Sequence, residues 1–440
     1  MKGRVHLGVG NDLKDIARKH ISIEGTMKSK SILLIIILFN SSILFAQKAN
    51  NVKVKEEPQK GKVYFSPLPV IAVNPTYGVM YGLAASTSMF VGEPSNTRMS
   101  TSLGTLTYST KKQLMFTFKT NMYLAEDNWI LLGDWRYFNT SQPTYGLGTG
   151  PQSVKLAPGS GYEYKDGMFS EPVPDAQLMK FKYLRFHETV LKKIQTNFYA
   201  GIGYHLDIHS DIKDNLLNPD TIPQVITSHY AYSTHYGYNP EKYTLSGISL
   251  NAMYDSRDNA ATPYKGMYAL ITFRYNPEFL GSSQNASSLW VEYRDYISLS
   301  KKPQPSHMLA FWVYGNFQTS GHLPYLDLPA LGWDQFGRSG RAYTQGRFRG
   351  ENLVYSELEY RIHLLGIKKN PDFMGAVAFV NTTTASNKDA NIALFQYMNF
   401  GYGVGLRFMM NKTSRTNITL DYAWGAYGAQ GLFLNVNETF

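Results

Sequence analysis

Long runs of alternation between apolar and small or polar residues restrict this chain more than any other feature. In the clearest run, residues 197–209, every even-numbered residue from Phe198 to Ile208 is apolar or aromatic. Successive side chains of a β-strand point to opposite faces, so this run predicts a long strand with one apolar face. The pattern returns at residues 401–409 and 416–424. The sequence therefore predicts an all-β protein built of long strands.

Strand length and composition favour a single-chain transmembrane antiparallel β-barrel. The chain contains 17% charged and 14% aromatic residues, whereas soluble proteins carry about 25% charged residues. Beyond one N-terminal stretch, it has no apolar run of about 20 residues that could form a membrane helix. Lipid-facing and lumen-facing residues alternate in a barrel, so its mean hydropathy stays modest. The sheet must close, because an open edge in lipid would leave backbone groups unpaired.

Residues 27–46 predict export. Lys28 and Lys30 precede an apolar core at residues 32–39, and a second apolar patch ends at Ala46. A positively charged start, a short apolar core and a small residue at the cleavage site are typical of a signal peptide. We therefore expect cleavage near Ala46 and a multi-pass protein in the bacterial cell outer membrane of a Gram-negative organism.

The rest of the chain divides into three parts. Residues 1–26 do not fit the export pattern, and Met27 resembles the natural start, so we interpret them as a non-native or unstructured prefix. Residues 47–65, which are polar as far as Gly61, are expected to form a flexible periplasmic lead-in. Residues 66–440 are expected to form the barrel. An even number of strands is usual, and 16 strands leave about 25 residues for each strand and its connection.

Loop lengths and the last residue indicate how the barrel is oriented and assembled. Insertions at residues 140–177, 211–239 and 321–352 are expected outside the cell, because periplasmic turns of such barrels are short. Phe440 ends an apolar alternating stretch. A terminal aromatic residue on an exposed strand edge suits recognition by strand pairing. We predict that Phe440 is a C-terminal assembly signal, read by the barrel assembly machinery during biogenesis.

Three clusters of residues carry a resemblance to a known family. The first is a strand-end motif: Asp255, Arg257 and Asp258, followed by Pro263 and Gly266. The second joins a loop to a strand: Arg349 and Gly350, followed by Glu359 and Arg361. The third comprises the glycine-rich residues 401–407, followed by Asp421 and Tyr422. In this order the clusters resemble the BamA/TamA family of the bacterial surface antigen superfamily.

The resemblance implies a barrel of 16 strands whose long sixth extracellular loop folds into the lumen. Carried over, Arg349 beside Gly350 would be the cation at the loop tip, and Glu359 its partner on the wall, with Arg361 on the same strand face. A guanidinium in a partly dehydrated lumen requires a carboxylate partner. The family's second wall acid would fall near Asn381, which is not an acid.

The resemblance also implies a function. We expect a barrel that aids insertion or translocation of protein or lipid at the outer membrane, by thinning the membrane beside a weakly paired seam between residues 78–90 and 431–440. We find no POTRA modules, the family's periplasmic client-receiving domains, in this sequence, so a separate periplasmic partner is one alternative. A passive or gated solute pore, and a surface antigen or structural scaffold, are the competing hypotheses.

The expected partners are outer-membrane lipids and lipopolysaccharide. Nucleic acid is not expected, because the Lys and Arg residues behind the net charge of +10 are spread along the chain. His205 and Asp207 share the predicted lumenal face, but no Ser or Cys nucleophile is placed beside them in the sequence, so we expect no enzyme. The chain has no Cys and no His/Cys metal spacing, and we expect neither a metal nor a cofactor.

Overall fold

Most of the chain is described by a computed structural model. The described residues are 59–150, 163–165, 168–169, 176–221, 224–260, 262–300, 307–367, 370–411 and 415–440. The expected prefix 1–26, the signal peptide 27–46 and most of the lead-in 47–65 lie outside these residues.

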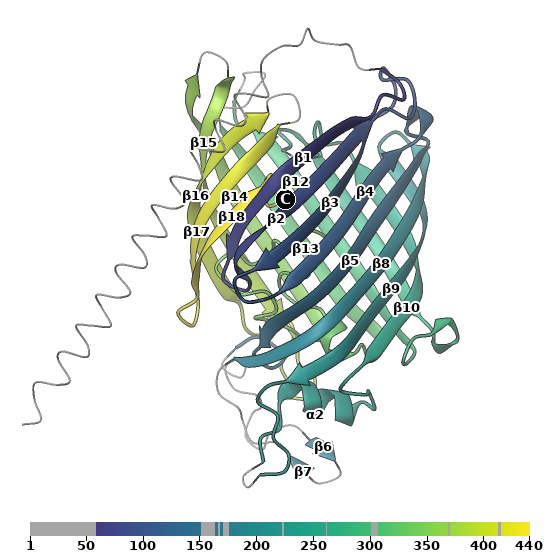
Figure 1. Ribbon diagram of the computed structural model, residues 1–440, viewed down its shortest axis with the longest axis vertical. Coiled ribbons are helices and arrows are strands. Elements are labelled where there is room, and N and C mark those ends of the chain that lie inside the picture. The colour runs from purple at the N-terminus through teal and green to yellow at the C-terminus, as the bar shows by residue number, and fades with distance from the viewer. Residues whose placement is uncertain are drawn as a thin grey trace, which may run out of the picture. The chain divides into compact units, whose positions relative to one another are not determined.

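The described residues form sixteen antiparallel strands that close into one barrel (Figure 1). Consecutive strands of the wall are hydrogen-bonded neighbours, and the first strand meets the last. This confirms the predicted 16-strand all-β barrel. The strands are β1 Tyr64–Asn74, β2 Gly78–Met89, β3 Ser100–Ser109, β4 Leu114–Tyr123, β5 Trp129–Thr144, β8 Gln177–Gln195, β9 Phe198–Asp214, β10 Tyr243–Asp255, β11 Gly266–Asn276, β12 Ala286–Ser298, β13 His307–Gly321, β14 Asn352–Ile367, β15 Asn370–Ala385, β16 Asn399–Asn411, β17 Thr416–Gly425 and β18 Gln430–Val436.

The alternation in the sequence separates the two faces of the wall. On β16, Tyr402 and Val404 are 59% and 55% exposed, while Gly403 and Gly405 between them are buried. Apolar and aromatic side chains thus point outward, where a membrane barrel meets lipid, and small or polar ones line the lumen. Among the described residues, no helix has the length and apolar character that a membrane span requires.

The barrel closes between β1 and β18. Only Val73 and Leu434 are in register across this seam, whereas β1 pairs with β2 over its whole length. The expected seam strand was wrong, because residues 78–89 form the second strand, β2, and not the first.

Two prolines explain why the first strand was misplaced. Pro67 and Pro69 lie within β1 and interrupt its alternation, and the strand begins at Tyr64 rather than at residue 66. Proline has no N–H to give to a ladder, so within sheets it is confined to edge strands, strand starts and bulges. β1 behaves as an edge strand, because on the side that faces β18 only Val73 is in register with a partner.

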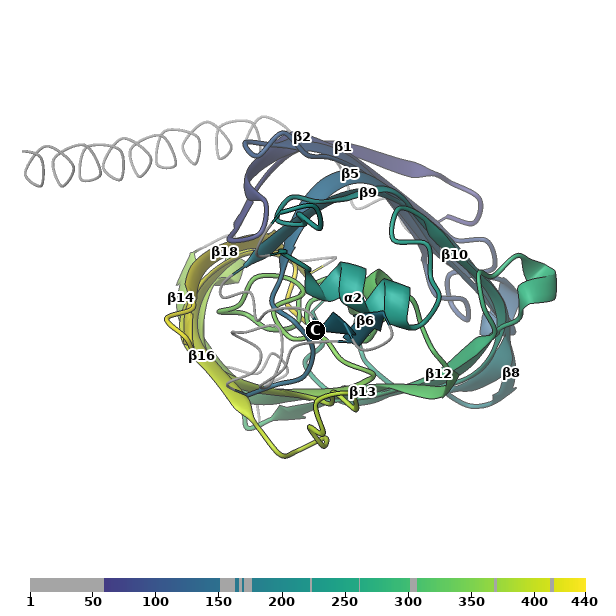
Figure 2. The same cartoon turned by 90° about the horizontal axis from the view of Figure 1, so that it is seen from below.

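Three long connections leave the barrel at one end. Residues 145–176 contain β6 Glu163–Lys165 and β7 Met168–Phe169, and residues 215–242 contain the helix α2 Ser228–His235. Figures 1 and 2 place α2 across the opening at this end. The third contains the short helix η4 Tyr325–Asp327, and the short helices η1 Ala125–Asp127 and η3 Glu278–Leu280 lie in other connections. That the α2 end is extracellular remains a prediction.

The third long connection, residues 322–351, folds into the lumen and is called the plug segment below. Its side chains Tyr325, Leu331 and Phe348 are at most 1% exposed. They pack in two clusters with lumenal wall residues, among them Tyr183 and Trp312. A lumen filled in this way explains how polar and aromatic wall residues become buried inside a barrel.

Candidate functional site

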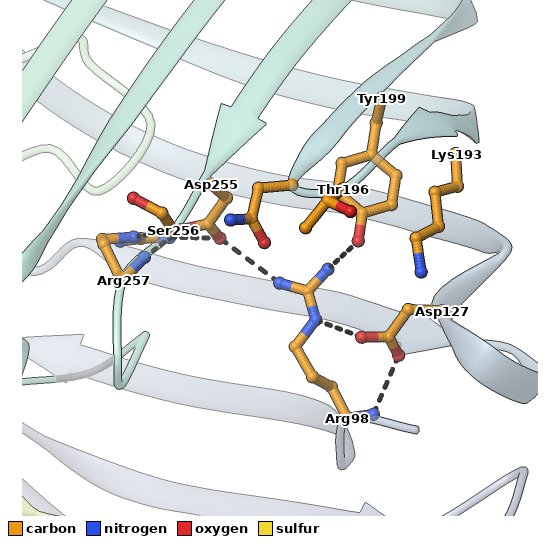
Figure 3. Close-up of a pocket in the computed structure, with 9 residues that line it drawn as sticks. Arg98, Asp127, Lys193, Thr196, Tyr199, Asp255, Ser256 and Arg257 are labelled. Atoms are coloured by element: carbon orange, nitrogen blue, oxygen red, sulfur yellow. Dashed lines mark hydrogen bonds and ion pairs between the residues drawn. The ribbon is translucent and has the colours of Figure 1, made fainter. Parts of the chain in front are cut away.

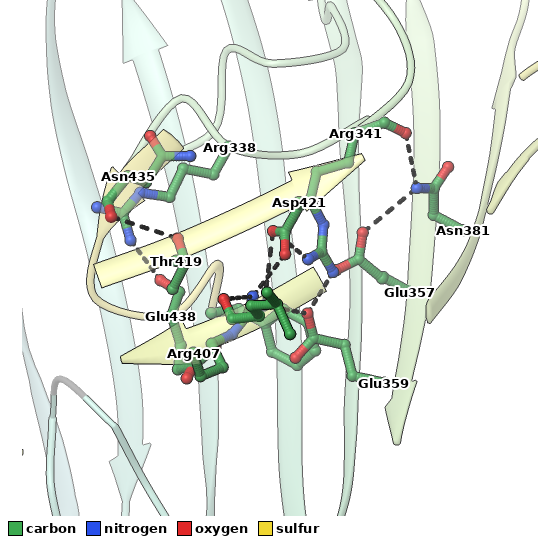
Figure 4. Close-up of polar contacts among 12 residues, drawn as sticks. Arg338, Arg341, Glu357, Glu359, Asn381, Arg407, Thr419, Asp421, Asn435 and Glu438 are labelled. Atoms are coloured by element: carbon green, nitrogen blue, oxygen red, sulfur yellow. Dashed lines mark hydrogen bonds and ion pairs between the residues drawn. The ribbon is translucent and has the colours of Figure 1, made fainter. Parts of the chain in front are cut away.

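Arg341 of the plug segment is the centre of a buried ion network (Figure 4). Its Nη2 lies 2.5 Å from Glu357 Oε1 and also contacts Glu359, and its Nη1 lies 2.8 Å from Asp421 Oδ2. These four side chains are at most 2% exposed. The guanidinium also stacks on Phe379, 3.5 Å from the ring centroid. A planar guanidinium suits this arrangement, because it can donate to several carboxylates at once.

Two wall arginines offset part of the remaining negative charge. Arg407 Nη1 lies 2.5 Å from Asp421 Oδ1, and its Nε lies 2.7 Å from Glu438 Oε2. Arg361 Nη2 lies 2.6 Å from Glu359 Oε2. The network therefore joins the plug segment to β14, β16, β17 and the residues after β18. Removing one partner of a buried pair is strongly destabilising, because the other charge is left uncompensated.

Arg349 does not form the expected pair with Glu359. Its Nη1 donates to the backbone carbonyls of Tyr325 and Leu326, at 2.8 and 2.9 Å. It is 1% exposed and ties the two ends of the plug segment together, while Arg341 meets the wall acids instead. Next to it, Gly350 lies against the backbone of Ser386, where a Cβ would be 2.0 Å from the carbonyl oxygen.

Asn381 binds the backbone of the plug segment rather than the guanidinium of Arg341. Its Nδ2 donates to the Arg341 carbonyl at 3.0 Å, so the acid expected near this position is supplied by Asp421. The lumenal glycines of β16 make room for the network. A Cβ at Gly405 would lie 1.8 Å from Asp421 Oδ1, and one at Gly401 would lie 3.0 Å from the Arg341 carbonyl.

The C-terminal residues turn into the lumen. β18 ends at Val436, and the Phe440 ring lies 5.2 Å from that of Trp312. Arg338 of the plug segment donates to the carbonyls of Val436, at 2.7 Å, and of Glu438. Phe440 therefore does not lie on the last strand of the folded barrel. A role as an assembly signal, which would act before folding, stays a prediction.

Comparisons with known proteins agree with this architecture. The model of the Omp85 superfamily domain matches residues 90–440. The chain belongs to the Omp85 superfamily. No curated protein matches it.

Two solved structures resemble this chain at low sequence identity. BamA from Haemophilus ducreyi lacking POTRA domains 1–3 is 14% identical, with a TM-score of 0.53 over 87% of this chain and 71% of that chain. CdiB from Acinetobacter baumannii is 13% identical, with a TM-score of 0.49 over 86% of this chain and 65% of that one. The likeness to BamA supports the barrel fold.

The strand-end motif of this Omp85 barrel lies at the end opposite α2. Arg257 Nε lies 2.8 Å from Asp255 Oδ1, and Asp258 Oδ2 lies 2.8 Å from Arg415 on the β16–β17 connection. Asp258 Oδ1 accepts the Tyr264 N–H at 2.9 Å.

Pro263 of the strand-end motif is buried in the same turn. Gly266 has φ +97°, and a Cβ there would lie 2.3 Å from the Ser256 carbonyl. The motif thus fixes a turn.

A small polar pocket adjoins this turn (Figure 3). Arg98 donates through Nε to Asp127 at 2.7 Å and through Nη2 to the Tyr199 hydroxyl at 2.8 Å. Its Nη1 lies 3.5 Å from Asp255 Oδ2. The pocket has a volume of about 170 Å³ and is also lined by Lys193. Most of its charges already pair with one another, so the pocket braces the ends of several strands.

The lumenal His205 and Asp207 belong to a second wall network. Asp207 contacts Arg185, His187 and Arg274 at 3.0, 2.8 and 2.6 Å. A serine that is not adjacent in the sequence does lie beside His205, because Ser249 of the neighbouring strand places its Oγ 2.7 Å from His205 Nε2. Ser249 is 1% exposed and also accepts a hydrogen bond from Asn251. We assign this contact to the polar wall.

Sequence reasoning found the wall of the site but missed its central cation. The predicted lumenal face includes Glu359, Arg361, Arg407 and Asp421. Arg341 was missed because it lies in a loop without a strand period, and Glu438 was missed because the tail was predicted to continue the last strand, which ends at Val436. The clustering of four arginines between residues 338 and 349 is the one signal that could have indicated a basic plug.

Proposed function

We propose that this Omp85 barrel aids insertion or translocation of protein or lipid at the outer membrane. The β1–β18 seam would open sideways, and the membrane beside it would be locally thinned. Export with cleavage near Ala46, and client delivery by a separate periplasmic partner, are parts of the same proposal.

The observation that carries the proposal is the weak closure of the barrel. One register pair joins β1 to β18, and β18 has 7 residues, against 10 or more in each of the other strands of the wall. A backbone hydrogen bond contributes about 0.5–1.5 kcal/mol, so a short ladder costs little to separate. The unpaired edge of β1 could then pair with an incoming strand.

A reversible lock tests whether the seam must open. The chain has no Cys, so Val73→Cys with Leu434→Cys, which replaces the register pair, introduces a single disulfide. We expect wild type to speed the folding of a small barrel protein into liposomes above lipid-only controls. The oxidised double variant should lose this acceleration, and a reductant should restore it.

The matched control is Leu83→Cys with Leu106→Cys, a register pair of the fully paired β2–β3 ladder. This pair also faces outward, since the two leucines are 70% and 50% exposed. Its disulfide should leave the acceleration unchanged. The proposal would be wrong if the oxidised seam variant were as active as its reduced form, or if wild type gave no acceleration.

The plug segment supports a second candidate, a gated solute pore. The ion network holds the segment against the lumenal wall, and the bonds of Arg349 to the Tyr325 and Leu326 carbonyls tie the two ends of the segment together. Displacement of such a segment would open a path through the barrel. Conductance measurements separate this function from the first, because a lateral seam does not require an aqueous path.

A further inference from the structure

Two turns of the wall flank the seam at the α2 end of the barrel. Residues 75–77 join β1 to β2, and residues 426–429 join β17 to β18 (Figure 1). The first turn lies against the start of β18, since a Cβ at Gly431 would be 2.4 Å from the Pro75 ring. The one register pair of the seam lies two residues before Pro75, and β18 ends two residues after that pair, at Val436. Backbone pairing therefore closes the seam only near the α2 end.

Gln345 of the plug segment binds the β1–β2 turn from inside the barrel. Its backbone N–H donates to Thr76 Oγ1 at 2.8 Å, and its side-chain Oε1 accepts from the Tyr77 hydroxyl. Thr76 is 4% exposed, so water has little access to replace the first bond. Gln142 of β5 donates from Nε2 to the Gln345 carbonyl at 2.5 Å. Residue 345 is thus fixed to the wall on the β1 side of the seam.

Tyr343, two residues earlier, binds the wall on the β18 side. Its hydroxyl accepts from the Ala426 N–H at 2.9 Å and donates to the Phe400 carbonyl. Gly425 makes room for the ring, since a Cβ there would lie 2.7 Å from Tyr343 Cζ. The Tyr343 side chain is 3% exposed. Three consecutive residues of the plug segment therefore connect the two sides of the seam.

We propose that residues 343–345, called the clasp below, hold the seam closed from the lumen, so that the seam opens only when the clasp releases. Separation of β1 from β18 moves the β1–β2 turn away from the β17–β18 turn. A chain reaches at most about 3.3–3.6 Å per residue, so Tyr343 and Gln345 cannot follow both turns. Displacement of the plug segment thus favours lateral opening. That the clasp regulates insertion rests on the proposed function, whereas its hold on the seam does not.

Thr76→Val with Tyr77→Phe, the clasp variant, tests this hold. It removes both bonds between the turn and Gln345 and keeps the shape of each side chain. The matched control is Thr144→Val with Tyr314→Phe. These are the same two changes, and they remove bonds to the plug segment from β5 and β13, away from the seam. Heat-modified gel mobility verifies that each barrel is folded.

Hydrogen exchange resolved to single residues measures the seam in the purified full chain, without a client. Protected amides exchange through local opening, so their rates report its free energy. Loss of two hydrogen bonds predicts exchange about 5- to 140-fold faster around Val73 and Leu434 in the clasp variant. Leu434 is the decisive position, because its strand carries no substitution. The control variant should exchange there as wild type does.

Unchanged exchange around Leu434 in the clasp variant would overturn the proposal, as would an equal increase in the control. Tyr77→Phe alone removes one bond and should give a smaller increase, which keeps the test available if the double variant does not fold.

The liposome assay separates this inference from the proposed function. The clasp variant should speed the folding of a small barrel protein more than wild type does. Faster exchange around Leu434, with no acceleration by wild type, would support the clasp and reject the insertion function. Acceleration by wild type, with unchanged exchange in the clasp variant, would support the insertion function and reject the clasp.

Discussion

At the scale of single residues, the strongest coupling is expected between Arg341 and Glu357. Their contact is 2.5 Å and both side chains are buried, so a change in either leaves the other charge without compensation. A double-mutant cycle of Arg341→Met and Glu357→Gln should give a coupling of about 0.5–3 kcal/mol, measured by urea unfolding. The exposed pair Lys182–Asp211, at 2.6 Å, is the control and should give a much smaller coupling, because water screens the two charges. Equal couplings for the two pairs would contradict this assignment.

The same residues show how far the sequence could predict the site. Period-2 alternation assigns Glu359 and Asp421 to the lumen, because a strand fixes which way each side chain points. It cannot choose between Arg341 and Arg349, since the plug segment is a loop whose backbone has no period. The choice depends on tertiary contacts, including the Asn381 amide that holds the Arg341 carbonyl.

At the scale of elements, the inward-turned tail should stabilise the last strand. Arg338 donates to the carbonyls of Val436 and Glu438 at the end of β18. Arg338→Met removes both bonds, so residues 430–436 should exchange their amide hydrogens faster, as locally less stable segments do. Exchange in β17, which pairs with β16 and β18, should change less. Unchanged exchange in β18 would show that the tail does not stabilise it.

The helix α2 provides a pH-dependent element at the mouth of the barrel. Burial, and then the positive charge of Arg349, lower the pKa of His229 from 6.5 to about 3. Its ring packs 5.5 Å from that of Tyr325 and 6.3 Å from that of Tyr243, and His209 adds to the lowering. The folded helix therefore excludes a proton that the unfolded segment binds.

The sign of this effect follows from proton linkage. The contribution of His229 is fully present above pH 6.5 and is lost as the pH falls towards about 3, with a slope of up to about 1.4 kcal/mol per pH unit. Protection of α2 against hydrogen exchange should thus fall between pH 7 and pH 5, after correction for intrinsic rates. His229→Asn does not titrate and should remove this pH dependence; a variant that retains it would show that another group is responsible.

Sequence patterns predict regular elements better than interrupted ones. The alternating strands β9, β16 and β17 coincide with runs seen in the sequence, whereas β1 was missed because Pro67 and Pro69 break its pattern. The tail was predicted as part of a strand, but Asn437 adopts φ +68° and turns the chain inward. Isolated left-handed residues of this kind depend on local contacts, not on periodicity.

At the scale of the whole molecule, the barrel closes because every strand edge must be paired in lipid. This requirement does not determine which residues fill the lumen. The plug segment decides whether the barrel can conduct. Gly346 N donates to the Leu331 carbonyl at 2.7 Å, so the two ends of residues 332–346 lie together and the part between them can be shortened without stretching the chain.

Deletion of residues 333–345 removes Arg341 and the Gln335 carbonyl that accepts from Arg136 at 2.8 Å. If the plug closes an aqueous path, planar-bilayer recordings should show steady conductance for the deletion and little for wild type. Arg341→Ala alone should give briefer openings, because Asn381 still holds the backbone at residue 341, and Leu331 and Phe348 still pack in the cluster of the wall. Lys182→Ala on the exposed wall should behave as wild type. Silent bilayers for every variant would exclude the pore function and leave the lateral seam as the route into the membrane.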